Sequence, residues 1–368
     1  MSLLSSERFR AAFAPPRYLA LPFSGTDLSA SGVKAVSLSQ GAHGLVLESY
    51  AEARFPGGVF VNGDIIEHDV VIEALGVAAR AAGISSTNAA LPEPKSYLFE
   101  AVVSGENKRE WRTALEQHLD ELVPLDPREA AFDIVKVGNG ERGGRSAVRV
   151  AGVAFAQRLV DDTLSVFDQA RIGVRALEGE TFAMARALLS SSDDSTVLII
   201  DVGKTTTKMS IVEERIPRFA TTIDIGGHAL TLAVQKHFGV TEEEARRVKA
   251  EHGIVPESGN EDYLAAMLST MSAIRDEISS RLEYWQNKAF PSGTHKPVAH
   301  AILAGGNASV RGFPEYLEEA LHIPVRLGDV FTNLASRNYW IPQLDYTESL
   351  AYATAIGLAL RDVHPYAP

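Results

Sequence analysis

The sequence contains no cysteine, so neither a disulfide bond nor a catalytic thiol contributes to its fold or its chemistry. This absence fits a reducing compartment. Basic residues are outnumbered by acidic ones, 35 against 47, which gives a formal net charge of -12. Proteins that bind nucleic acid usually present a basic face, so this charge argues against a nucleic-acid partner.

Long apolar runs are also missing. No stretch reaches the length that crosses a bilayer, and residues 1–10 carry Glu7 and two arginines instead of the apolar region of a signal peptide. Residues 361–368 carry no amphipathic helix that would insert into a membrane surface. We therefore expect a protein without direct membrane insertion, which reaches a membrane only through a partner.

A length of 368 residues suffices for two domains with separate cores. The chain is organised around residues 197–212, which read VLIIDVGKTTTKMSIV. An apolar run ends at Asp201 and Gly203, and a second run that alternates apolar and polar residues follows three threonines. This pattern predicts a buried strand, a tight turn and an antiparallel partner strand.

The turn has the composition of a phosphate-binding loop. Gly203 can adopt a positive φ, and without a Cβ it lets a phosphate approach the backbone. Thr205, Thr206 and Thr207 supply hydroxyl and N–H groups, and Asp201 stands where it would hold a hydrated Mg²⁺. An ordinary β-hairpin with a polar turn explains the same residues.

The same pattern occurs earlier in the chain. Residues 27–34, DLSASGVK, place an aspartate, small residues and hydroxyls in a turn, and a second strand follows at 35–38. The strand before this turn, at 18–23, is weakened by Pro22. Two such units suggest two related domains that face one phosphate site, although two unrelated short hairpins would look alike.

The other expected elements divide the chain further. Residues 96–166 form a small unit of order β-α-β-β-α, in which one helix covers 108–123. A helix over 242–251 opens with a capping box of Thr241 and Glu244. A long helix over 261–288 has an apolar stripe that we attribute to core packing, at Leu264, Leu268, Met271, Ile274, Ile278 and Trp285.

Five motifs, in the same order along the chain, resemble those of the actin-like ATPase superfamily. They are residues 27–34 and 201–207 for the two phosphate motifs, 301–307 for the adenosine motif, and 180–186 and 348–357 for two connecting helices. The resemblance implies an α/β actin-like ATPase fold with two RNase H-like domains and a small inserted β-α-β-β-α subdomain. It places the first domain at 1–95 and 167–195, the insertion at 96–166, the second domain at 196–345 with a helical lobe at about 236–295, and a returning helix at 346–368.

Within the superfamily, the sequence resembles the PilM family of type IV pilus assembly proteins and, next to it, the FtsA cell-division proteins. Residues 96–166 stand where both families carry an inserted subdomain. Residues 225–231 with 238–249 resemble the stretch that contacts nucleotide in these families. FtsA ends in a membrane-targeting helix, which this sequence lacks, and this favours PilM.

The resemblance implies ATP and Mg²⁺ as ligands. It assigns Asp27 and Asp201 to the metal, and Glu180 either to orienting an attacking water or to a plain charge at a helix N-terminus. The expected nucleotide-binding residues are Asp27, Ser29, Ser31, Asp201, Gly203, Lys204, Thr205, Thr206, Thr207, Gly226, Gly227, Arg246, Lys249, Gly305, Gly306 and Asn307.

Three residues depart from the family pattern. Ser29 replaces a usual glycine, Lys204 can neutralise a phosphate or replace the metal in part, and Arg246 stands where FtsA-like proteins carry an acidic residue. We therefore expect ATP binding with weak turnover at most.

By resemblance, the expected partner is the N-terminal peptide of a PilN-like bitopic inner-membrane protein in a pilus or related type II secretion system. Self-association, as in actin relatives, is a further expectation. An FtsA-like division protein and a small-molecule kinase of the same fold are the alternatives.

Overall fold

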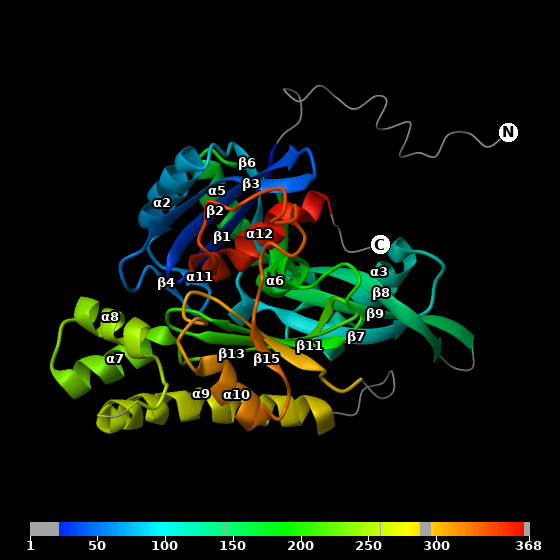
Figure 1. Ribbon diagram of the computed structural model, residues 1–368. Coiled ribbons are helices and arrows are strands. Elements are labelled where there is room, and N and C mark those ends of the chain that lie inside the picture. Colours follow the sequence, from blue (N-terminus) through cyan, green and yellow to red (C-terminus); the bar gives the residue numbers. More distant parts are fainter. Residues whose placement is uncertain (1–21, 143–144, 258, 288–295, 364–368) are drawn as a thin grey trace.

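The structure, a computed structural model, describes residues 22–142, 145–257, 259–287 and 296–363 (Figure 1). The lead-in and the strand start expected before Pro22 lie outside these residues, as does the end of the tail. In the described part, no helix combines the length and the apolar character that a bilayer span requires.

The first domain is built on a five-stranded sheet in the order β10-β6-β1-β2-β3. Its strands are β1 (Phe23–Ser29), β2 (Gly32–Gly41), β3 (Gly44–Arg54), β6 (Ser86–Leu91) and β10 (Gly173–Gly179), and a short hairpin adds β4 (Phe60–Val61) and β5 (Asp64–Ile65). The helices α2 (His68–Ala81) and α5 (Gln157–Gln169) cover one face, where Leu75, Val166 and Phe167 are fully buried.

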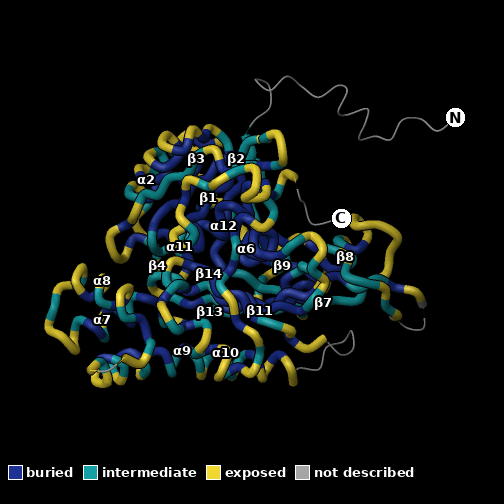
Figure 2. Tube along the Cα trace, in the orientation of Figure 1, coloured by how far each residue is buried: buried dark blue, intermediate teal, exposed yellow. Residues whose placement is uncertain are grey.

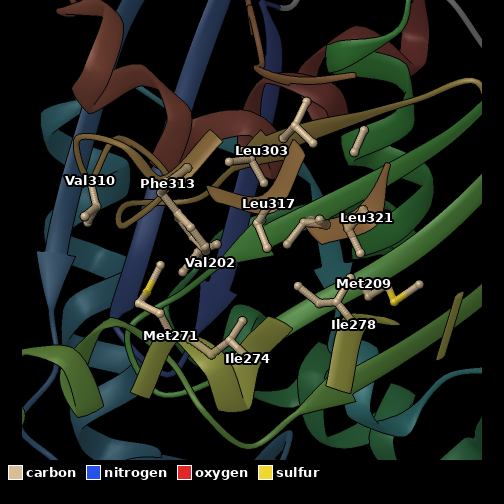
Figure 3. Packing of buried hydrophobic residues seen from close by; sticks show 14 of the residues in the cluster. Val202, Met209, Met271, Ile274, Ile278, Leu303, Val310, Phe313, Leu317 and Leu321 are labelled. Carbon is tan, nitrogen blue, oxygen red and sulfur yellow. The ribbon is translucent and has the colours of Figure 1, made fainter. Parts of the chain in front are cut away.

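The second domain repeats this plan with the sheet β13-β12-β11-β14-β15. Its strands are β11 (Thr196–Val202), β12 (Thr207–Glu213), β13 (Ile216–Ile223), β14 (His300–Ala304) and β15 (Val325–Leu327). Its helices are α7 (Gly227–Phe238), α8 (Glu242–His252), α9 (Glu261–Asn287) and α10 (Phe313–Leu321). Figure 3 shows how Met271, Ile274 and Ile278 of α9 pack beneath the sheet with residues of α10.

Strand β11 is apolar throughout because both of its faces are buried. Leu198 and Ile200 face the core under α9, whereas Val197 and Ile199 face the helices between the two domains. A strand covered on both faces reads as a continuous apolar run, which is the pattern that the sequence presents here.

Two helices lie between the sheets, α6 (Glu180–Leu188) and α12 (Ala353–Ala359) (Figure 1). The second is preceded by α11 (Tyr346–Ser349) and a turn of 3₁₀ helix, η4 (Leu350–Tyr352), so the single helix expected over 348–360 is divided. A dark buried band runs through this region in Figure 2. The fully buried Ala355 and Ile356 of α12 share one core with the second sheet. The two domains therefore meet on a pair of buried helices.

The inserted unit is a three-stranded antiparallel sheet in the order β7-β9-β8. Its elements are β7 (Tyr97–Val103), α3 (Lys108–Glu116), α4 (Leu119–Leu122), β8 (Ala130–Arg142) and β9 (Arg145–Ala156). The single helix expected over 108–123 is thus two helices, which share one core at Trp111, Leu115 and Leu119. Helix α5 packs into the core of the first domain. The boundary of the insertion expected at residue 166 remains a prediction.

Candidate functional site

The turns β1–β2 and β11–β12 open onto one cleft of about 550 Å³ between the two domains. The cleft brings together residues that are far apart in the sequence. Of the expected nucleotide-binding residues, those that line it are Asp27, Ser29, Ser31, Asp201, Gly203, Lys204, Thr205, Thr206, Gly227, Arg246, Lys249, Gly305, Gly306 and Asn307.

The two aspartates occupy equivalent places in the two hairpins. Asp27 lies in β1 opposite Lys34 of β2, and Asp201 lies in β11 opposite Lys208 of β12. Neither aspartate lies in the turn itself, because each strand continues past it. Side chains at directly paired positions share one face of a sheet, so each hairpin presents a carboxylate and an ammonium together.

Asp27 is the buried acid of the pair. Its side chain lies at the cleft wall with 6% of the residue exposed. Its Oδ1 accepts no hydrogen bond from any described residue. Burial, followed by the charge of Glu180, raises the pKa of Asp27 to about 7. Burial also raises the pKa of Asp201. A buried carboxylate oxygen without a partner suits a cation or a water molecule that a cation orders.

The loop after β11 does not use the left-handed backbone expected at Gly203. The N–H of Gly203 donates to the carbonyl of Thr206 at 2.9 Å, and a Cβ at Gly203 would lie 2.9 Å from that same oxygen. The positive φ is found at Gly305 instead, where it is 92°. A Cβ there would lie 2.3 Å from Oδ1 of Asp201. Gly305 thus lets the loop after β14 pass directly against the second aspartate.

A hydrogen-bonded group joins the loops after β11 and β14 to the helices α7 and α8. Asn307 donates from Nδ2 to the carbonyl of Gly203 at 3.0 Å and accepts from Nζ of Lys249 at 2.9 Å. Lys249 also donates to the carbonyl of Gly227 and to Oγ1 of Thr231, both at 3.1 Å. Burial, and next the charge of Arg246, lowers the pKa of Lys249 to about 8.

Three of the expected residues do not line the cleft. Gly226 lies beneath the loop at 203–206, where a Cβ would be 2.6 Å from the backbone nitrogen of Thr206. Thr207 is fully buried in β12, and its hydroxyl donates to the carbonyl of Ile225 at 2.7 Å. Both residues support the loop from behind.

Glu180, the third of these, begins α6 and is 2% exposed. Its Oε2 accepts from Nζ of Lys208 at 2.5 Å and from the N–H of Glu93 at 3.0 Å. Glu180 lies with Asp201, Lys208 and Glu93 around a small cavity next to the cleft. A role in orienting water remains a prediction for this side chain.

The charged residues of the cleft that sequence reasoning missed include Lys34, Glu52, Arg54 and Lys208. The signal that would have found the two lysines is the repeated spacing of an aspartate and a lysine seven positions later, at 27 and 34 and again at 201 and 208. Glu52 and Arg54 carry no such signal, since they come from β3, the next strand of the sheet.

The family is decided by a match over most of the chain. Residues 25–363 match the model of the type IV pilus assembly protein PilM family. The chain belongs to this family. The resemblance to PilM and the actin-like fold expected from the five motifs are thereby confirmed.

Solved structures with the same fold agree with this assignment. The PilM family chain superposes on the PilM-PilN type IV pilus biogenesis complex with a TM-score of 0.74 at 21% identity, covering 95% of this chain and 100% of that one. MreB5 of Spiroplasma citri bound to AMPPNP gives a TM-score of 0.52 at 14% identity, covering 93% and 96%. The ethanolamine utilization protein EutJ from Carboxydothermus hydrogenoformans gives 0.50 at 17%, covering 94% and 90%.

Cell division proteins FtsA are similar over shorter regions. The protein of Borreliella burgdorferi is 29% identical over 165 residues, which are 40% of this chain and 40% of that protein. The protein of Rhizobium meliloti is 27% identical over 222 residues, 52% of this chain and 49% of that protein. The chain thus spans less than half of either division protein.

A second concavity of about 350 Å³ lies between the insertion and the first domain of this PilM family member. Val135 and Val153 of the inserted sheet face Leu177 and Phe182 across it. Its floor carries the ion pair of Arg186 and Glu178, with Nη2 and Oε1 2.6 Å apart. Strand β8 is an edge strand: it pairs with β9 on one side, and its other side pairs with no strand of the described residues. We call this concavity the insertion groove.

Proposed function

We propose that this PilM family protein is an ATP-binding scaffold of type IV pilus assembly or a related type II secretion system. It holds nucleotide in the interdomain cleft and a peptide of an inner-membrane partner in the insertion groove. The observation that carries the proposal is the presence of two separate concavities of opposite character. One is lined by charges and phosphate-loop residues, and the other by apolar side chains along an open strand edge.

The triphosphate would lie between the two hairpins, against the backbone of residues 203–206. A loop that exposes successive N–H groups provides a concave site for anions. Gly305 and Gly306 would let the adenine and ribose rest on the backbone, with Lys249 and Arg246 on the opposite side. Mg²⁺ fits at the unpartnered oxygen of Asp27, held through water, and when bound it would neutralise phosphate charge. Asp201 already has Nζ of Lys208 within 3.9 Å of its Oδ2.

Isothermal titration calorimetry with Mg-ATP tests the nucleotide site. We expect saturable binding with one site per chain and only slow release of phosphate. Analysis of the gently purified protein for bound nucleotide provides a second readout. If the titration shows no heat of binding and the purified protein carries no nucleotide, the cleft does not bind ATP, and this part of the proposal is wrong.

The second ligand would be the N-terminal peptide of a PilN-like membrane protein. The solved complex of similar fold is described as a PilM-PilN complex, and this supports a partner of that kind. An extended peptide can add to an open sheet edge, where main-chain hydrogen bonds give affinity and side-chain pockets give specificity. Strand β8 supplies such an edge, and Val153, Leu177 and Phe182 supply apolar contacts beside it.

Substitutions in the groove test this capture without removing the insertion. Val135→Arg and Val153→Arg place a charge on half-buried groove positions. In a pull-down with the PilN-like peptide of the same organism, both should lose binding. Val61→Arg is the matched control, because Val61 is 44% exposed on β4, outside the groove. Equal capture by all three variants would contradict the groove assignment.

Buried polar contacts lead from the cleft to the start of the insertion. Lys208 contacts Glu180, and Glu180 accepts from the N–H of Glu93. Glu93 begins the turn that leads into the insertion, and its carboxylate accepts from the hydroxyls of Thr181 and Ser96. A nucleotide that sets the angle between the domains would therefore also act on the insertion, as a hinge-type switch.

This function places the protein in the cytoplasm, recruited to the inner membrane through its partner. The FtsA matches favour one alternative, a role in cell division. Fluorescent fusions separate the two. Foci that depend on the PilN-like protein support the pilus scaffold, and a ring at the septum supports the division protein.

A further inference from the structure

The side chain of Lys208 lies between the carboxylates of Glu180 and Asp201, at the wall of the proposed nucleotide site. Its Nζ is 2.5 Å from Oε2 of Glu180 and 3.9 Å from Oδ2 of Asp201. The side chain is 18% exposed and lines the interdomain cleft. An ammonium group in this position supplies a fixed positive charge where two acids converge.

The first domain carries the matching lysine. Lys34 lies opposite Asp27, as Lys208 lies opposite Asp201, and its side chain is 7% exposed. Its Nζ donates to Oγ of Ser31 at 2.9 Å and lies 3.8 Å from Oε1 of Glu52. Each phosphate hairpin thus contains its own cation, positioned by strand register.

These lysines place positive charge beside Asp27 and Asp201, where the phosphates of a bound nucleotide would lie. A polyphosphate that enters between Asp27 and Asp201 is repelled by both carboxylates, and a divalent cation usually removes this repulsion. Here the ammonium of Lys208, between Glu180 of the first domain and Asp201 of the second, already offsets part of this negative charge. Buried charges interact strongly because water screens them little, so a fixed ammonium has a large effect.

We propose that Lys208 is a built-in counter-cation of the nucleotide site, so that ATP binds with little dependence on Mg²⁺. The inference rests on the nucleotide site proposed above. It concerns binding only, because Lys208 cannot coordinate phosphate oxygens in the geometry that a metal ion imposes on a transferring phosphoryl group.

The test is calorimetric titration of the full chain with ATP, once with excess Mg²⁺ and once with excess EDTA. For the wild type we expect the two dissociation constants to agree within about threefold. For Lys208→Gln, which keeps a polar side chain without the charge, EDTA should weaken binding at least about tenfold more than it does in the wild type. Lys208→Arg should keep the ratio of the wild type.

Lys236→Gln is the matched control. Lys236 is exposed on α7 and is not among the described residues that line the cleft. Its loss should leave the affinity in both buffers, and their ratio, unchanged. Because Lys208→Gln leaves the buried Glu180 without its cation, Glu180→Gln/Lys208→Gln serves where the single variant does not fold.

The outcomes separate the two proposals. Wild-type affinity that falls at least about tenfold in EDTA, or a Lys208→Gln ratio equal to that of the wild type, overturns the counter-cation and leaves the nucleotide site intact. No binding in either buffer overturns the nucleotide site and this inference with it.

Discussion

Gly357 of α12 lies so close to α6 that a Cβ on it would be 1.8 Å from the carbonyl oxygen of Ala183. On the other side of the same helix, a Cβ at Gly25 of β1 would be 2.0 Å from the carbonyl oxygen of Ala355. Both obstacles are backbone atoms, which cannot turn away. Small residues on α12 and β1 therefore allow α12 to pack closely against α6 and β1.

Gly357→Ala should consequently destabilise the whole protein. The methyl group forces α6 and α12 apart, and overpacking of this kind costs about 1–3 kcal/mol or more. Urea denaturation followed by circular dichroism measures the free energy of unfolding. Gly57→Ala is the control, because a Cβ there has no atom within 4 Å among the described residues. A Gly357→Ala protein as stable as the wild type would contradict the close packing of α12 against α6.

The two glycines of the loop after β14 predict a difference in nucleotide affinity between their alanine variants. Gly305 has a φ of 92°, and a Cβ there would meet Asp201 at 2.3 Å, whereas a Cβ at Gly306 would meet only Ala351 at 3.6 Å. Gly305→Ala should weaken ATP binding at least about tenfold. Gly306→Ala should retain the fold and serve as the neighbouring comparison. Titration calorimetry distinguishes them, and equal affinities would show that the loop tolerates the methyl group.

Sequence reasoning could predict this loop because strand, glycine pair and asparagine follow one another within 301–307. The strand pair 196–202 and 207–213 was predictable for a similar reason, since both strands and their turn are local. In α9 the sequence placed the buried stripe slightly wrongly. Tyr263 and Met267 are buried, and Leu264 and Leu268 are half-buried. Hydrophobicity alone does not decide which of two adjacent apolar residues faces a core.

The insertion groove could not be located from composition or spacing. It forms where β8 and β9 of the insertion face β10 and α6 of the first domain, elements that lie tens of residues apart. Only their packing brings Val135 near Leu177. The interdomain contacts of Glu180 were missed for the same reason, because its partners Lys208 and Glu93 come from different domains.

Lys249 predicts a pH dependence of stability. Its pKa falls from 10.5 to about 8 on folding, chiefly through burial. Between these values the unfolded chain binds more protons than the folded one, so the free energy of unfolding rises with pH across this window. Below pH 8 the buried ammonium remains charged. The free energy of unfolding is then about 3 kcal/mol lower than it would be if the pKa of Lys249 stayed at 10.5.

Lys249→Met removes this titration. Relative to the wild type, the variant should be more stable at pH 7 than at pH 10.5, because only the wild type gains stability as the pH rises across this window. Urea denaturation of both proteins at matched pH values measures the difference, which cancels the titration of other groups. A constant difference over the whole range would mean that Lys249 titrates normally in the folded protein.

The ion pair beneath the insertion groove predicts a contrast between single and double substitution. Arg186 and Glu178 are 1% and 11% exposed, and two hydrogen bonds of 2.6 and 2.7 Å join them. Arg186→Met alone should cost about 3–5 kcal/mol, because the buried carboxylate loses both hydrogen bonds and keeps Arg361 only at 3.9 Å from its Oε2. Glu178→Met/Arg186→Met should recover most of this loss, because buried apolar pairs replace buried ion pairs at little net cost.

The double variant also reports on the groove. If capture of the PilN-like peptide depends on apolar contacts and the β8 edge, the double variant should bind as the wild type does. If it folds with wild-type stability but no longer binds, the charged floor recognises a polar group of the peptide. Peptide titration by fluorescence anisotropy, after urea denaturation has established stability, separates the two results. The apolar lining at Val153, Leu177 and Phe182 leads us to expect the first.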